Sequence, residues 1–91
     1  MAFTVRVELH KAEGYYEHLH AQMRARGFNQ VIQSDQGTWY KLPAAEYQFP
    51  VASTCGQVLT LAQQAVAAIG KTAWFLVTEV ASQMWLLETI P

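Results

Sequence analysis

Two histidines and two arginines lie within the stretch EHLHAQMRARGF, residues 17–28. A histidine beside an arginine can cleave RNA, because the imidazole takes the proton of a 2′-hydroxyl while the guanidinium holds the phosphate. We therefore consider His20 and Arg24 as candidate catalytic residues and Arg26 as a candidate RNA contact. The same side chains also suit the exposed surface of an ordinary helix, so both interpretations stay open.

Helical geometry limits what the two histidines can do together. Successive residues turn by about 100° around a helix, so His18 and His20 lie about 200° apart and cannot bind one metal ion. His18 falls on the outer face of the helix, where we expect its side chain to meet solvent. His20 lies one turn from both Tyr16 and Arg24, at the edge of the buried stripe, and its alternative role is to pack on Tyr16. Arg24 and Arg26 also fit a helix end, whose negative dipole favours cations.

Other residues with chemical potential lie outside this helix. Arg6 is a second candidate RNA contact, and His10 is a further candidate catalytic residue. Glu8 and His10 share one strand face, but two protein ligands make a poor metal site, so we expect no metal and no cofactor. Cys55 lies in the first turn of a helix, where the helix dipole can lower the pKa of a thiol, but we expect a buried or bystander thiol there. The aromatic residues can stack bases, but they more often belong to a core or an interface.

Composition bounds the class of protein. With 91 residues, of which 52% are hydrophobic and 14% charged, the chain predicts one domain that leaves apolar surface exposed. Such surface favours a homodimer, although surplus aromatic side chains also line ligand grooves. The net charge of −1 gives no overall signature of nucleic-acid binding, which leaves only a local basic patch for single-stranded RNA and predicts no DNA binding.

Targeting signals are not visible in the chain. The start MAFTVRVELH alternates between apolar and polar residues instead of forming an apolar run behind positive charge, so no signal peptide is predicted. No apolar run approaches the length of a membrane span, and no membrane association is expected. A single cysteine suits a reducing compartment. We therefore expect a cytoplasmic protein.

Hydrophobic periodicity places the elements of the first half. Alternation over residues 3–9 predicts a strand with one buried face. Helical spacing over residues 15–26, stopped by Gly27, predicts a helix. A second strand is expected at about residues 28–34, followed by the hairpin turn SDQG at residues 34–37.

The second half begins with a return strand at residues 38–42, which Pro43 interrupts and which residues 45–49 continue along an edge. Thr54 and Gln57 fit a capping box at the start of a second helix, which Gly70 ends. The apolar stripe of that helix is Val58, Leu61, Ala62, Ala65 and Ile69. Residues 73–80 predict a central or interface strand, and residues 84–90 an extra strand that pairs back through a turn at 81–83.

The resulting order is β-α-β-β-α-β, the ferredoxin-like arrangement, over a single domain of residues 1–91. The right-handed crossover rule places both helices on one face of an antiparallel sheet. The other face carries the outward residues of the first strand, and we expect it to meet water, a ligand or a second copy. These residues are Thr4, Arg6, Glu8 and His10.

The whole chain also resembles a known family. The start AFTVRVELH, the helix end RGF, the hairpin SDQGTWYKLPAAEY and the late stretches VLTLAQQAV and GKTAWFLVTE are similar to the GhoS-like family over roughly residues 2–80. The members of this family are small bacterial antitoxins of type V toxin–antitoxin systems. The resemblance implies a ferredoxin-like fold and an endoribonuclease that cleaves the messenger RNA of its toxin. It ties activity to basic residues of the first helix, without a one-to-one match here.

Three functions stay open from the sequence. The first is a metal-independent endoribonuclease antitoxin that uses His20, Arg24 and His10 for catalysis, with Arg6 and Arg26 on RNA. The second is a noncatalytic dimeric interaction domain, which binds a partner through its exposed sheet face or an edge strand. The third is a small-molecule binding module lined by aromatic side chains.

Overall fold

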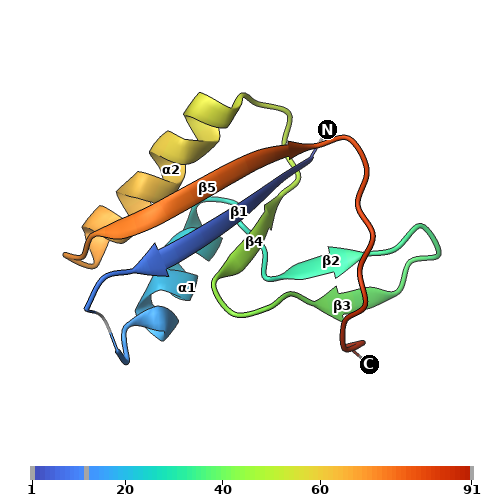
Figure 1. Cartoon of the computed structure of the whole chain (residues 1–91), viewed down its shortest axis with the longest axis horizontal. Coiled ribbons are helices and arrows are strands. Elements are labelled where there is room, and N and C mark those ends of the chain that lie inside the picture. Colours follow the sequence, from blue (N-terminus) through green and yellow to red (C-terminus); the bar gives the residue numbers. More distant parts are fainter. Residues whose placement is uncertain (1, 12, 91) are drawn as a thin grey trace.

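The computed structural model describes residues 2–11 and 13–90 of the chain (Figure 1). Its strands are β1 (Ala2–Leu9), β2 (Val31–Gln33), β3 (Trp39–Lys41), β4 (Glu46–Phe49) and β5 (Ala73–Val80). Its helices are α1 (Tyr16–Ala25) and α2 (Cys55–Ala68). The predicted α+β class, with two helices and antiparallel strand pairing, is confirmed.

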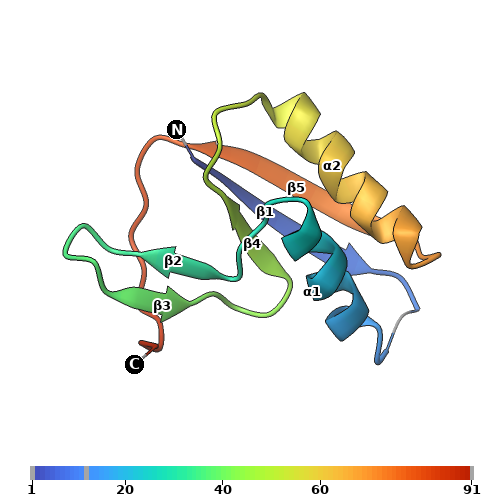
Figure 2. The same cartoon turned by 180° about the vertical axis from the view of Figure 1, so that it is seen from behind.

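Strand β1 lies at the centre of the main sheet, between β4 and β5, and runs antiparallel to both. Figures 1 and 2 show both helices on the same face of this sheet. The predicted alternation of β1 is confirmed, because the residues that point towards the helices are all buried: Phe3, Val5, Val7 and Leu9. Arg6 and Glu8, which alternate with them, are exposed on the opposite face, called here the open face.

Local signals set where the helices begin and end. The Thr54 hydroxyl accepts a hydrogen bond from the backbone N–H of Gln57 at 3.2 Å and caps α2. Gly27 follows α1 with φ of 93°, and Gly70 follows α2 with φ of 69°, which is a conformation that glycine adopts without a Cβ clash. The faces that pack on the sheet carry Leu19 and Met23 of α1, and Val58, Ala62, Ala65 and Val66 of α2.

Strands β2 and β3 form a hairpin that is a separate sheet. Its predicted turn is confirmed: the Gly37 N–H donates to the Ser34 carbonyl at 2.9 Å, and Gly37 has φ of 89°. The second strand is shorter than expected because Asn29 leaves the hairpin and bridges to Gln48 of β4. The strands expected in one ferredoxin-like sheet are therefore divided between β4-β1-β5 and β2-β3.

The C-terminal part departs from the predictions in two ways. Of the two alternatives for residues 73–80, the central position is wrong, because among the described residues β5 pairs with β1 alone and forms an edge, whereas the interface alternative stays a prediction. Residues 84–90 do not pair back onto β5. They run beside β3, where the Lys41 N–H donates to the Glu88 carbonyl and the Ile90 N–H donates to the Trp39 carbonyl, both at 2.9 Å (Figure 1). The side chain of Gln83 hydrogen-bonds to Thr4 and Gln48 and so directs the chain away from β5.

Candidate functional site

A buried histidine–tyrosine pair joins α1 to the main sheet. His20 of α1 is only 8% exposed, and its Nδ1 lies 2.6 Å from the hydroxyl of Tyr47 on β4. Tyr47 itself is completely buried, beneath the helix. The rings of His20 and Tyr16 lie 6.3 Å apart, so the expected packing on Tyr16 is present. The helix and the sheet therefore hold the imidazole of His20 from two sides.

Burial sets the protonation of this pair. It lowers the pKa of His20; the carboxylate of Glu17 opposes this shift and the charge of Arg24 adds to it. Burial also raises the pKa of the Tyr47 hydroxyl. Because the ordinary pKa of His20 is 6.5 and the shift is downward, the side chain at pH 7 is a neutral imidazole beside a phenol that keeps its proton.

His20 lines a groove of about 540 Å³. One wall comes from α1, a second from β3 and the loop after it, and a third from the C-terminal segment, which contributes Leu87 and Glu88. The groove also contains Lys41 and Gln30. Charges of both signs therefore surround the imidazole, with Glu17 and Glu88 as the acids.

Arg24 lies one helical turn after His20. Its guanidinium is exposed, and Nη1 is 3.5 Å from the Oε1 atom of Gln30, which lines the groove. The structure thus brings together two of the predicted residues, His20 and Arg24, and adds Lys41 as a second cation. A neutral imidazole can abstract a proton, and Arg24 and Lys41 can contact a phosphate, although the carboxylates of Glu17 and Glu88 lie in the same groove.

The other predicted site residues lie elsewhere. His10 follows β1 on the open face, with Nδ1 3.1 Å from the Thr72 hydroxyl and its ring 4.9 Å from that of Trp74. Arg6 is exposed on the same face. Neither residue lines the His20 groove, and Arg6 lines a separate hollow with Tyr16 of α1.

Arg26 completes the end of α1. Its Nη1 donates to the Gln22 backbone carbonyl at 3.0 Å and to the Gln22 side-chain Oε1 at 2.8 Å. These contacts match the helix-end interpretation, in which the cation satisfies backbone groups of the last turn.

Sequence reasoning missed the residue that holds His20. Tyr47 alternates with Phe49 in the stretch AEYQF, and both are buried. A tyrosine at a core-facing strand position needs a partner for its hydroxyl, and that requirement is the available sequence signal. Lys41 and Glu88 were also missed, because they reach the groove only through the pairing of the C-terminal segment with β3.

Further observations concern residue exposure, metal binding and membrane spans. His18 is exposed, as predicted. Cys55 is exposed as well, so the expectation that its thiol is buried is wrong and the bystander alternative stays a prediction. Within residues 2–11 and 13–90, no three His, Cys, Asp or Glu side chains gather where they could hold a metal ion. The described part of the chain has no helix of the length and apolar character that a membrane span needs.

In comparisons with known proteins, no family model matches the chain and no curated protein matches it.

Proposed function

We propose that this chain is a metal-independent endoribonuclease of the GhoS-like antitoxin type, with its cleavage centre in the His20 groove. The observation that carries the proposal is a neutral imidazole, fixed by Tyr47 in the wall of a groove that contains Lys41, with Arg24 one turn away. The resemblance of the chain to that family over residues 2–80 adds the RNA substrate.

In the proposed reaction, Nδ1–H of His20 donates to the Tyr47 oxygen, which leaves the lone pair of Nε2 free as the base. Nε2 removes the proton of a ribose 2′-hydroxyl, and the oxygen attacks the adjacent phosphorus. A bond forms between this oxygen and phosphorus, and the bond to the 5′-oxygen breaks. The products are a 2′,3′-cyclic phosphate and a 5′-hydroxyl, which takes its proton from the imidazolium. Arg24 and Lys41 offset the phosphate charge.

We also propose that the fold is a variant of the ferredoxin-like arrangement. The element order and the antiparallel placement of β1 between β4 and β5 support this relation. The bridge between Asn29 and Gln48 supports it further, since it joins the start of the hairpin to β4, where the remaining strand of such a sheet would lie.

The test is cleavage of mixed single-stranded RNA by purified protein in the presence of EDTA. We expect the wild type to cut RNA and to leave a DNA strand of the same sequence intact, because DNA lacks the nucleophilic hydroxyl. His20→Gln should reduce the rate roughly 100-fold or more, the usual contribution of a general base. Arg24→Ala should reduce it by about tenfold or more, since a charged hydrogen bond contributes roughly 1.5–3 kcal/mol.

The matched control is His18→Gln, which removes an exposed histidine from the same helix and should keep the wild-type rate. Circular dichroism establishes that each variant is folded. Cleavage that is absent from the wild type, or that is equal in His20→Gln and His18→Gln, would contradict the proposed centre.

A second candidate function is a dimeric interaction domain, favoured by the outer edge of β5. This strand has eight residues, Ala73–Val80, and contains no Lys, Arg, Pro or Gly. Its charged side chain, Glu79, lies next to its last residue. Proteins usually protect edge strands with charged side chains or proline, and an apolar edge without them pairs with another strand. Trp74 is 69% exposed and Leu76 is 63% exposed on the open face. We propose that two copies pair β5 with β5 in an antiparallel fashion, with Leu76 on the two-fold axis.

Sedimentation velocity at tens of micromolar protein tests this pairing. We expect a dimer for the wild type and a monomer for Leu76→Lys, which places two like charges opposite each other at the axis. Leu86→Lys is the control, because Leu86 is 99% exposed on the C-terminal segment, away from β5, and should remain dimeric. A monomeric wild type, or a Leu76→Lys variant that is still a dimer, would contradict the proposed pairing of β5 with β5.

A further inference from the structure

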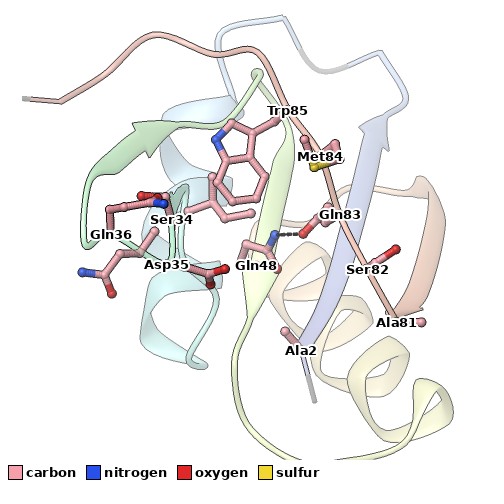
Figure 3. A pocket seen from close by; sticks show the side chains of 12 residues that line it. Ala2, Ser34, Asp35, Gln36, Gln48, Ala81, Ser82, Gln83, Met84 and Trp85 are labelled. Atoms are coloured by element: carbon pink, nitrogen blue, oxygen red, sulfur yellow. Dashed lines mark hydrogen bonds between the residues drawn. The ribbon is translucent and has the colours of Figure 1, made fainter.

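A second cavity, of about 700 Å³, lies between the turn of the β2–β3 hairpin and the C-terminal segment (Figure 3). Asp35 of the turn, Gln48 of β4, and Gln83 and Trp85 of the C-terminal segment are among its lining residues. The cavity does not include His20 or any other residue placed in the cleavage centre.

One acceptor atom of a residue that lines this cavity is buried without a partner. Gln48 is 7% exposed, and its Nε2 donates to the Oε1 atom of Gln83 at 2.9 Å. Gln83 in turn donates to the Thr4 hydroxyl at 2.8 Å. The Oε1 atom of Gln48 then has no hydrogen-bond partner, although it is shielded from solvent. Such an atom is costly to leave unmatched, which suggests that a ligand donates to it.

The backbone holds this acceptor in place. The N–H of Gln48 donates to the Asn29 carbonyl at 2.7 Å, and the Asn29 N–H donates to the Gln48 carbonyl at 2.8 Å. These bonds hold the main chain of Gln48, and the link through Gln83 to Thr4 of β1 holds its side-chain amide. The group is therefore organised before any ligand arrives.

The remaining walls indicate the chemistry of that ligand. Trp85 is half-buried, with its ring 5.7 Å from that of Tyr40, and it offers a flat surface for stacking. Asp35 supplies a carboxylate, which accepts hydrogen bonds and donates none. No Lys or Arg side chain lines the cavity among the residues the structure describes.

We propose that this cavity is a guanine-binding subsite. Guanine presents an N1–H and an N2 amino group side by side, which matches the carboxylate of Asp35 and the free acceptor of Gln48, while its plane stacks on Trp85. Adenine and cytosine offer fewer adjacent donors, and uracil presents mainly acceptors. This inference rests on the proposed RNA substrate and specifies which base the protein selects.

The position of the subsite suits a strand that continues into the cleavage centre. The C-terminal segment lines both spaces, since it contributes Trp85 here and Leu87 and Glu88 to the His20 groove. The β2–β3 region likewise lines both, through Asp35 here and Lys41 there.

Binding separates this inference from cleavage. The probes are short 2′-O-methyl RNAs that differ at one base, because they lack the nucleophilic hydroxyl and cannot be cut by the proposed reaction. Affinity is measured by quenching of tryptophan fluorescence. We expect a strand with one guanine to bind at least tenfold more tightly than the same strand with inosine, which lacks the N2 amino group, or with uracil. Guanosine monophosphate is measured as well, to compare a free nucleotide with a guanine in a strand. Tight binding of the nucleotide or of the guanine-containing strand supports the subsite.

Two variants locate the binding. Asp35→Asn and Gln48→Leu should each remove most of the preference for guanine over inosine. Glu13→Gln makes the same charge change as Asp35→Asn at an exposed position outside the cavity and should keep the preference. Equal binding of all bases, a preference for uracil, or a guanine preference that survives both variants would overturn the subsite. Guanine binding without any RNA cleavage would retain the subsite and overturn only the proposed nuclease. Cleavage with no base preference would retain the nuclease and overturn the subsite.

Discussion

At the scale of single residues, the pair of His20 and Tyr47 makes stability depend on pH. The folded pKa of His20 lies below its ordinary value of 6.5, so the folded protein binds fewer protons than the unfolded chain as the pH falls. Its contribution is fully present above about pH 6.5 and is lost as the pH falls from there through the folded pKa. We expect the free energy of unfolding in urea to decrease between pH 7.5 and 5.5 in the wild type, and to decrease less in His20→Gln.

His18→Gln is the control for this pH dependence, because His18 is exposed on the same helix. It should keep the slope of the wild type. An equal slope in the wild type and in His20→Gln would show that protonation of the buried imidazole does not limit stability in this range.

The hydroxyl of Tyr47 can be tested separately from its ring. Tyr47→Phe leaves Nδ1 of His20 without its partner at 2.6 Å, and an unmatched buried polar group costs about 1–3 kcal/mol. We expect that decrease in the free energy of unfolding. Tyr40→Phe, at a half-buried tyrosine outside the pair, should change it by less than about 0.5 kcal/mol. A loss in Tyr47→Phe as small as that in Tyr40→Phe would contradict a stabilising hydrogen bond.

At the scale of elements, the start of α2 forms only half of the predicted capping box. Thr54 accepts from the Gln57 N–H as the capping box predicts, but the Gln57 side chain accepts from the Ser53 hydroxyl at 2.7 Å instead of returning to Thr54. Thr54→Ala should therefore lower the free energy of unfolding by about 1 kcal/mol. Ser53→Ala removes an exposed side-chain contact only and should cost a few tenths, which urea titrations of the two variants can distinguish.

The elements that sequence predicted well are those with local causes. The alternation of β1, the glycine after each helix and the turn before Gly37 all depend on neighbouring residues. The partner of His20 was not predictable in the same way, because Tyr47 is 27 residues away and meets it only when α1 packs on β4. The error at residues 84–90 has the same origin, since hydrogen bonds from Gln83 to distant strands decide the path of the segment.

At the scale of the whole molecule, the C-terminal segment connects the two sheets. It hydrogen-bonds to β1 and β4 through Gln83 and then to β3 through the backbone of Glu88 and Ile90 (Figure 1). The hairpin otherwise joins the main sheet through the bridge between Asn29 and Gln48. Both proposed sites, the His20 groove and the guanine subsite, include this segment, so it couples their geometry.

Removing residues 81–91 should therefore loosen the hairpin before the main sheet. The Lys41 N–H loses its acceptor on Glu88, and the hairpin loses its second attachment. We expect hydrogen exchange of the β2–β3 amides to accelerate at least tenfold, while the amides of α2, which pack on β5, keep wild-type protection. Equal acceleration in α2 would mean that the segment supports the whole core. Unchanged exchange in the hairpin would mean that the Asn29–Gln48 bridge alone holds it, and the two sites would then not depend on the C-terminal segment for their shape.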